Sequence, residues 1–533
     1  QRQMCIRDRA AGLLLNRQAM ASHTFITGST GTGKSNAVYH LLDEITKNGQ
    51  TTFLVVEPAK GEYKNVFGNC TDVQVFGTNP RETPLLRMNP FAFPENIHIL
   101  EHIDRLVEIF NACWPMYAAM PAVLKDAIER SYQKVGWDLR NSESEKGIFP
   151  TFFDLLDILP GVIEESHYSK DTQSDYVGAL CTRVKSLTNG IYGSVLCAED
   201  ALSDAEMFDQ NVIVDLSRVG SMETKSLLMG ILVMKLQEYR MCSSGMNSRL
   251  RHVTVLEEAH NLLRKTSAEQ SQEGANLQGK SVEMLANAIA EMRTYGEGFI
   301  IADQAPGLLD MSVIRNTNTK IILRLPDEED RKLVGKSAAL KEAQIDELSK
   351  LPLGVAAVYQ NEWPEAVLCK IEAYPMPENA VYHKPSKMPH EINAEFVFGQ
   401  LAVGKELEPL SSSEMEQLKL WLKRHETVLK PEDSRYLERV FAGGELDVAK
   451  TRKAVFDFFG GIGTVVDYCA AAEKSLTPRK EFLEQLQGQY GLKAAAADWV
   501  LNSVISMGMS LNPDAKAVDN LRTNFERQGG RVL

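Results

Sequence analysis

The stretch Phe25-Ile-Thr-Gly28-Ser-Thr-Gly-Thr-Gly33-Lys34-Ser35 decides the fold, because it joins an apolar strand to a glycine-rich loop and the helical pattern 36–47. This order is that of a P-loop, whose backbone N–H groups surround phosphates at a helix N-terminus. Lys34 would counter the charge of the β- and γ-phosphates, and the Ser35 hydroxyl would hold Mg²⁺. We therefore predict an α/β protein that binds ATP and Mg²⁺. The predicted nucleotide-binding residues are Gly28, Ser29, Thr30, Gly31, Thr32, Gly33, Lys34, Ser35 and Asn36.

Short β-branched runs alternate with longer helical patterns, which is typical of a mainly parallel sheet covered by helices. The runs are 25–28, 52–57, 212–216, 253–257, 299–303, 320–325 and 355–359. Between residues 95 and 210 such runs are missing, and apolar residues recur at helical spacing instead. We predict an α-helical insertion there, with Trp114, Tyr117, Tyr132 and Trp137 in its core.

The chain has 533 residues, more than one hydrophobic core usually serves, so several domains are expected. Residues 1–9 fit no helix or strand period, and residues 1–19 are interpreted as an N-terminal remnant, artefactual or truncated. The predicted order is then first core part, α-helical insertion, second core part, Pro-rich linker or strap, and helical C-terminal domain. Their bounds are 20–94, 95–210, 211–373, 374–411 and 412–533.

Composition narrows the class of protein. No run of about 20 apolar residues is present, and the eight cysteines lack a CxxC spacing, so we expect a cytoplasmic protein without a membrane span. A formal net charge of -13 counts against a surface that is basic throughout. It leaves room for a local basic channel.

A second acidic element follows the strand His252-Val-Thr-Val-Leu256, which ends in Glu257 and Glu258. Side chains alternate along a strand, so we expect the two carboxylates to point in different directions and to divide the work. Glu257 is predicted to be the Mg²⁺ ligand, with Ser35. Glu258 is predicted to be the general base that orients and deprotonates the attacking water. For the following His260 and Asn261, a helix-start hydrogen bond and a nucleotide contact are both open.

Two further polar residues are predicted to be catalytic. Gln304 follows the strand 298–303 and is well placed to sense the γ-phosphate. Arg293 lies near a helix end and is our candidate for an arginine finger that reaches the ATP of a neighbouring subunit. Arg315 and Arg324 are alternative finger or sensor candidates.

Four sequences resemble the HerA–FtsK group of P-loop ATPases, and within it the HerA-like (DUF87) branch: ITGSTGTGKSN (26–36), EPAKGEY (57–63), LEEAHN (256–261) and RTYGEGFIIADQ (293–304). The resemblance covers roughly residues 20 to 372. It implies a RecA-like core, a homohexameric ring with ATP bound between subunits, and double-stranded DNA as the substrate of translocation. It also implies a partner nuclease or another effector, in DNA-end processing or antiphage defence. Glu57, Glu62 and Tyr63 would then lie near the phosphates or the subunit interface.

Two departures from the branch limit these expectations: its N-terminal β-barrel has no counterpart here, and the insertion and C-terminal region match nothing we can place. In a ring, DNA would meet only loops that face the pore. The candidates are the polar and basic segments 239–251 and 264–280. The leading hypothesis is a DNA translocase. The alternative is an ATP-gated scaffold that regulates an effector without moving along DNA.

Overall fold

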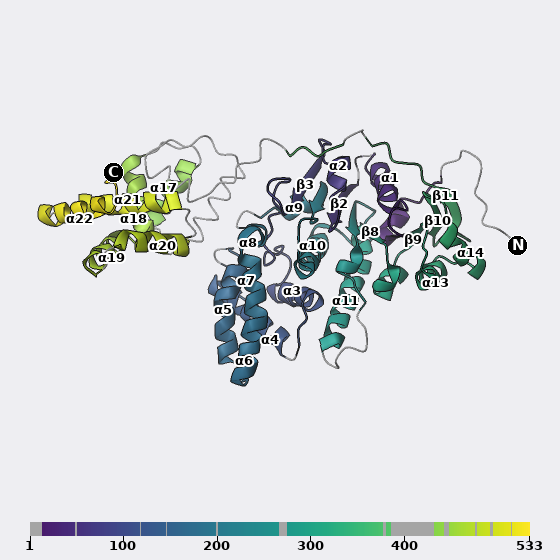
Figure 1. The fold of residues 1–533 in the computed structure, drawn as a ribbon, viewed down its shortest axis with the longest axis horizontal. Helices are drawn as coiled ribbons and strands as arrows, with labels where there is room; N and C mark the ends of the chain where they lie inside the picture. The colour runs from purple at the N-terminus through teal and green to yellow at the C-terminus, as the bar shows by residue number, and fades with distance from the viewer. Residues whose placement is uncertain are drawn as a thin grey trace. The chain divides into compact units, whose positions relative to one another are not determined.

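The computed structural model describes most of the chain as two units, Gln1–Lys384 and Pro385–Leu533 (Figure 1). The residues that it describes are 13–47, 49, 51–117, 119–144, 147–198, 201–265, 274–376, 380–384, 431–441, 447–474, 477–490, 494–512 and 514–532. Most of the predicted remnant 1–19, most of the linker 374–411 and the first part of the region 412–533 lie outside these ranges.

A nine-stranded sheet forms the centre of the first unit, in the order β11-β10-β9-β1-β8-β7-β2-β6-β3. Its strands are β1 (Thr24–Thr27), β2 (Thr52–Glu57), β3 (Val73–Gly77), β6 (Asn211–Asp215), β7 (His252–Glu257), β8 (Glu297–Asp303), β9 (Thr319–Ile322), β10 (Val355–Gln360) and β11 (Val367–Lys370). All pairings from β9 to β3 are parallel, and β10 and β11 add an antiparallel edge. The prediction of a mainly parallel α/β sheet is confirmed.

The sheet is apolar on both faces, which is why its strands read as nearly continuous hydrophobic runs. Alternate residues of a strand enter different cores: Leu54 and Val56 belong to one cluster, and Phe53 and Val55 to the other. The helices α1 (Lys34–Thr46) and α2 (Tyr63–Phe67) cover one face (Figure 1). The other face is covered by α3 (Ile99–Cys113), α10 (Met222–Ser243) and α11 (Gly274–Glu291).

The predicted α-helical insertion is confirmed in kind. Besides α3 it contains α4 (Met120–Lys134), α5 (Phe152–Glu165), α6 (Lys170–Tyr176), a π-helix (Val177–Cys181), α7 (Thr182–Thr188), α8 (Gly190–Leu196) and α9 (Asp204–Phe208). It also holds a small hairpin, β4 (Trp137–Asp138) with β5 (Glu143–Ser144), which the sequence did not indicate. Trp114 and Tyr132 are buried as predicted, whereas Tyr117 is 49% exposed and does not belong to the core.

The remaining α-helices of the first unit lie between β8 and β10 in the chain. They are α12 (Met311–Arg315), α13 (Glu328–Ser337) and α14 (Glu342–Glu347). Beyond β11, the backbone N–H of Tyr374 donates to Asn36 Oδ1 (2.7 Å) and that of Tyr382 donates to Asn65 Oδ1 (3.0 Å). The described part of the predicted strap is therefore attached to α1 and α2.

The second unit is helical in its described residues and has its own apolar cluster. Its helices are α17 (Pro431–Phe441), α18 (Val448–Phe458), α19 (Gly461–Lys474), α20 (Pro478–Tyr490), α21 (Ala494–Leu511) and α22 (Ala515–Arg527). Within the part of the chain that the structure describes, no single helix is long and apolar enough to cross a membrane. One pair, Ala449–Phe458 with Gly461–Ala472, meets the length and composition together but is bent by 63°.

Candidate nucleotide-binding and catalytic site

Four neighbouring strands, β1, β8, β7 and β2, end at one edge of the sheet, and a pocket lies against this edge. The cavity measures about 200 Å³. It is lined by Thr30, Gly31, Gly33, Lys34, Ser35, Asn36, Glu57, Ala59, Lys60, Tyr63, Glu257, Glu258 and Gln304. The sheet topology thus brings together residues that the sequence separates by more than 200 positions.

The P-loop connects β1 to α1 and takes a conformation that needs its glycines. Gly31 and Gly33 have φ angles of +76° and +107°, where other residues are strained. At Gly28, an added Cβ would lie 2.7 Å from Leu323 Cβ. The Lys34 ammonium donates to the Gly28 carbonyl (2.7 Å), so the lysine is folded back over its own loop. Burial lowers the pKa of Lys34, and Glu258 and Glu257 oppose this shift.

Glu257 is the last residue of β7 and lies almost completely inside the protein. The Tyr63 hydroxyl donates a hydrogen bond to its Oε1. Burial, with a smaller contribution from Glu258, raises the pKa of Glu257 to about 7. The carboxylate is thus buried beside a neutral donor, an arrangement that favours binding of a cation.

Glu258 follows with a φ angle of +45°, in the left-handed region that a residue with a side chain rarely occupies. This turn ends the strand and lets Glu258 line the same pocket as Glu257. The expectation that strand alternation alone separates the two carboxylates therefore misses a backbone kink. Such strained residues are concentrated at functional sites.

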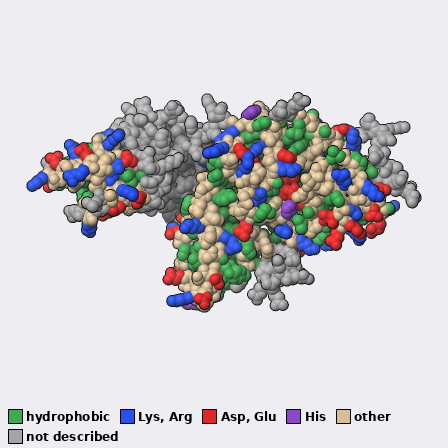
Figure 2. All heavy atoms as spheres, viewed as in Figure 1, with side chains coloured by type: hydrophobic (Ala, Val, Ile, Leu, Met, Phe, Trp, Pro, Cys, Tyr) green, Lys and Arg blue, Asp and Glu red, His purple; other side chains and the backbone are tan. Residues whose placement is uncertain are grey.

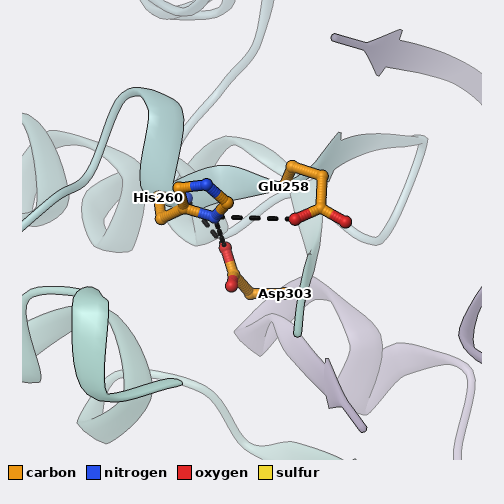
Figure 3. A group of neighbouring side chains, drawn as sticks. All are labelled: Glu258, His260 and Asp303. Atoms are coloured by element: carbon orange, nitrogen blue, oxygen red, sulfur yellow. Dashed lines mark hydrogen bonds and ion pairs between the residues drawn. The ribbon is translucent and has the colours of Figure 1, made fainter. Parts of the chain in front are cut away.

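A carboxylate and an imidazole hold the segment after Glu258 in place (Figure 3). Both the backbone N–H and the ring Nδ1 of His260 lie within hydrogen-bond distance of Asp303 Oδ2, at 2.8 and 2.9 Å. His260 Nδ1 is also 3.6 Å from Glu258 Oε2. The hydrogen bond to Asp303 raises the pKa of His260, so a protonated ring would neutralise the buried Asp303. Of the two roles left open for His260, the structure shows the structural hydrogen bond.

Gln304 comes directly after β8 and lines the pocket, as a γ-phosphate sensor would. Its Oε1 accepts a hydrogen bond from the Thr30 hydroxyl of the P-loop (2.8 Å). Asn36 also lines the pocket, but its amide is bonded elsewhere: Nδ2 donates to the Glu372 carbonyl (2.8 Å). Asn261 Nδ2 donates to the Glu258 carbonyl (2.7 Å) and so stabilises the turn.

Comparison with known proteins identifies the family. The family described as "Helicase HerA, central domain" matches residues 10–297, just over half of the chain. The chain belongs to this family. A relative, the DNA double-strand break repair helicase HerA of Sulfolobus acidocaldarius, is 26% identical over 370 residues, which are 67% of this chain and 66% of the relative. A probable helicase of Methanocaldococcus jannaschii is 23% identical over 390 residues, 68% of each chain. The chain thus spans about two thirds of the length of these relatives.

Solved structures support the same fold for this HerA-family chain. VirB4 of Thermoanaerobacter pseudethanolicus has a TM-score of 0.50 and 19% identity, and the alignment covers 66% of this chain and 90% of VirB4. The bacterial conjugative coupling protein TrwB has a TM-score of 0.50 and 14% identity, with coverage of 69% and 89%. At these identities the likeness shows the P-loop ATPase fold alone, and it confirms the predicted RecA-like core.

The donor atoms of the HerA-family pocket fit Mg²⁺. Magnesium prefers oxygen ligands and binds through one or two protein groups together with phosphate oxygens. Ser35 offers a hydroxyl and Glu257 a buried carboxylate in the same pocket. These two residues are therefore the ones that would hold the ion.

The sequence analysis did not identify Lys60, a cation that lines this pocket. Lys60 lies on the loop between β2 and α2, which Glu57 helps to hold in place. Glu57 at the end of β2 accepts the backbone N–H groups of Glu62 (2.7 Å) and Tyr63 (3.1 Å). Burial raises the pKa of Glu57 to about 8. Glu57 and Tyr63 line the pocket, as the resemblance implied. Lys60 could have been noticed as a charged residue inside the EPAKGEY sequence.

The three candidate arginines are divided between the two edges of the sheet. Arg293 and Arg315 precede β8 and β9, strands parallel to β1, so they lie at the edge where the strands begin. Arg324 follows β9, and its carbonyl accepts the Ser29 N–H (2.9 Å), so it lies beside the P-loop. All three are exposed. Arg293 is thus away from the pocket of its own chain, and only a second subunit would bring it to a nucleotide.

The first candidate DNA segment packs against the segment that carries Arg293. The Ser248 N–H donates to the Thr294 carbonyl (3.1 Å), and the Arg251 N–H donates to the Gly296 carbonyl (3.0 Å). Arg249 and Arg251 are exposed. Within the second candidate segment, 264–280, residues 266–273 lie outside the described residues.

On the face seen in Figure 2, basic and acidic side chains are interspersed over the first unit. Acidic side chains gather over α13, where Glu328, Glu329 and Asp330 occupy the first turn. This distribution agrees with the acidic net charge. A DNA contact is therefore expected at individual loops.

Proposed function

We propose that this chain is a Mg²⁺-dependent ATPase motor, which hydrolyses ATP as a homohexameric ring and moves along double-stranded DNA. One observation carries the proposal: a single pocket brings Lys34 and Ser35 together with Glu257, Glu258 and Gln304. Lys34 and Ser35 begin α1, and the other three side chains lie at or just after the ends of β7 and β8. A phosphate loop, a buried carboxylate, a second carboxylate and a polar sensor are the parts that phosphoryl transfer to water requires.

In this mechanism the oxygen of a water molecule forms a bond to the γ-phosphorus, and the bond from that phosphorus to the bridging oxygen of ADP breaks. Glu258 accepts the proton of the water. Burial, and then the nearby Asp303, raise the pKa of Glu258, which makes it a stronger base. Its Oε2 is buried without a hydrogen-bond partner among the described residues, and His260 Nδ1 lies 3.6 Å away. Lys34 stabilises the negative charge, and Gln304 contacts the γ-phosphate.

Ser35 and Glu257 would hold Mg²⁺, which would supply positive charge beside the phosphates. The rest of the reaction depends on the side chains named above. The strands need not move to bring these side chains together, because all of them lie at the same edge of the sheet.

DNA as the substrate is supported by relatives whose names describe DNA double-strand break repair helicases. The second candidate function is the ATP-gated ring that regulates a partner nuclease or a defence effector without translocation. Addition of double-stranded DNA distinguishes the two. A translocase turns over ATP faster with DNA, whereas a turnover rate that ignores DNA contradicts the motor.

Salt dependence locates the DNA contact. Each phosphate neutralised by a lysine or arginine adds about 0.9 to the slope of log affinity against log salt concentration. Replacing Arg249 and Arg251 together by alanine should flatten this slope by about two for each subunit that grips the duplex. ATP turnover without DNA should not change. An unchanged slope would remove this loop from the DNA-binding surface.

The ring has its own test, which uses the position of Arg293 away from its own pocket. Arg293→Ala and Lys34→Ala subunits are each expected to be inactive. When mixed, they form interfaces that join an intact P-loop to an intact arginine, and some activity should return. If subunits exchange and no activity returns, Arg293 is not the finger, and Arg315 or Arg324 takes its place.

A further inference from the structure

The loop between β2 and α2, residues 58–62, carries a cation that the catalytic scheme above does not use. Lys60 lines the nucleotide pocket with Lys34, Glu257 and Glu258. Its side chain is 54% exposed, so its ammonium group is accessible to a ligand. Glu62 Oε2 lies 3.7 Å from its Nζ, a weak pairing between two half-exposed side chains.

The backbone at Lys60 is strained. Its φ angle is +32°, and the Gly61 N–H donates to the Ala59 carbonyl (2.5 Å) across it, which closes a tight turn. Among the described residues other than glycine, six have positive φ angles, and two of them, Lys60 and Glu258, line this pocket. Strain of this kind persists only where the surroundings enforce it, and it is concentrated at ligand sites.

The surroundings do enforce the turn. The Glu57 carboxylate binds the two backbone N–H groups that follow the turn, at 2.7 and 3.1 Å. Behind the turn, an added Cβ at Gly61 would lie 3.0 Å from Ser217 Oγ, so only glycine packs there without adjustment. Lys64 Nζ pairs with the buried Asp215 at 2.6 Å and fixes the start of α2. The loop is therefore held at both ends, with Lys60 on the side of the pocket.

Lys60 shares its pocket with the groups predicted to surround the γ-phosphate and Mg²⁺. Lys34, Glu257 and Glu258 line this pocket together with Lys60. A cation on the wall of the same cavity is therefore near the position of that phosphate.

We propose that Lys60 is a second phosphate-binding cation, which contacts the γ-phosphate of bound ATP together with Lys34 and makes the site prefer nucleoside triphosphates to diphosphates. The inference rests on the proposed ATPase function, because it assigns a residue to the same pocket. It differs from a merely solvated lysine in one measurable respect. Loss of the charge should weaken binding of a triphosphate and leave a diphosphate nearly unaffected.

The experiment measures the affinities of the full chain for AMP-PNP, a triphosphate analogue that is not hydrolysed, and for ADP, both with Mg²⁺. Lys60→Met keeps the aliphatic stem and removes the charge. A charge-assisted hydrogen bond corresponds to a factor of about 10 to 100 in affinity, so AMP-PNP should bind at least about tenfold more weakly, and ADP within about twofold of the parent. Lys60→Arg should restore most of the affinity for AMP-PNP.

Two controls separate this role from a structural one. Glu62→Gln removes the partner of Lys60 but keeps its charge, and should leave both affinities unchanged. Lys47→Ala removes an exposed lysine that pairs with Asp43 and Glu44 on α1, and should also have no effect. Thermal melting of Lys60→Met should match that of the parent.

Three results would overturn the inference. AMP-PNP binding by Lys60→Met at the affinity of the parent would show a solvated lysine. Equal losses for AMP-PNP and ADP, shared by Glu62→Gln, would show that the pair only shapes the loop. If Lys34→Ala also leaves AMP-PNP binding unchanged, the proposed function fails as well, whereas an effect of Lys34→Ala alone leaves the proposed function in place.

Discussion

The two edges of the central sheet both bury charged groups, but they treat the charges differently. At the edge where the strands begin, Glu297 of β8 is completely buried. It accepts a hydrogen bond from Arg240 Nε (2.9 Å), one from the Thr254 hydroxyl (2.8 Å), and lies 2.7 Å from His252 Nδ1. Burial alone would raise the pKa of Glu297, but His252 and Arg240 outweigh it and hold the pKa below its usual range.

At the opposite edge, Glu257 is nearly as deeply buried, and its hydrogen-bond donor is the neutral phenol of Tyr63. Burial raises its pKa to about 7. The first edge satisfies its charge with a cation of its own chain. The second leaves a carboxylate that gains from a cation supplied from outside, which is the behaviour expected of a binding site. The comparison therefore separates structural from functional charges.

The largest expected effect lies at the phosphate edge. Lys34→Ala removes the counter-charge of the β- and γ-phosphates and should weaken ATP binding by about 100-fold or more. Equilibrium binding of a fluorescent ATP analogue measures the loss. Thermal stability should stay near that of the parent, because the hydrogen bond that the Lys34 ammonium makes among the described residues is to Gly28 of its own loop. Undiminished binding would remove the P-loop from the account.

At the opposite edge, which carries Glu297, the expected effect is on the stability of the protein. Arg240→Leu leaves Glu297 buried without its main cation, and breaking such a pair costs about 3–5 kcal/mol of the free energy of unfolding. Urea unfolding measures this loss, and ATP affinity of the folded protein should not change. Arg130→Leu is the matched control, because Arg130 is paired on the surface with Asp126 and Glu165 and should cost less than about 1 kcal/mol. Similar losses in the free energy of unfolding for the two variants would contradict the structural role of the buried pair.

A smaller effect tests the sign of the charge balance. The pKa of Glu257 is raised on folding, so its ionisation opposes folding, and this cost grows as the pH rises from about 4.5 to about 7. Without nucleotide and Mg²⁺, Glu257→Gln should therefore stabilise the protein by about 1–3 kcal/mol more at pH 8 than at pH 5. Glu297→Gln should be destabilising at pH 8, because that carboxylate gains stability when charged. Unfolding curves at both pH values decide, and equal shifts for the two variants would contradict the comparison.

The fold followed from local sequence where the strands are long and apolar. Seven of the strands coincide with predicted runs, because the interior of a parallel sheet demands such runs on both faces. The short strands β3 and β11 were not predicted. Val73–Gly77 contains the polar Gln74, and Val367–Lys370 is a half-exposed edge strand, so neither has a clear period. Their existence depends on pairing with β6 and β10.

The candidate site was predictable where a motif has a fixed backbone geometry. Lys34, Ser35, Glu257, Glu258 and Gln304 all line the predicted pocket. Lys60, the kink at Glu258 and the choice of Asp303 as the hydrogen-bond partner of His260 were not predicted. They arise from contacts between residues that are distant in sequence or from an unusual φ angle, and neither leaves a periodic signal.

The central claim is that the pocket separates binding of ATP from its hydrolysis, with Lys34 serving the first and Glu258 the second. The most direct measurement is single-turnover hydrolysis by Glu258→Gln, with ATP affinity determined in the same preparation. We predict an ATP affinity equal to that of the parent and a hydrolysis rate that is lower by at least about 100-fold. Glutamine keeps the shape of the side chain but cannot accept the proton of the water. Hydrolysis at the parent rate, or a loss of affinity as large as that of Lys34→Ala, would contradict the account.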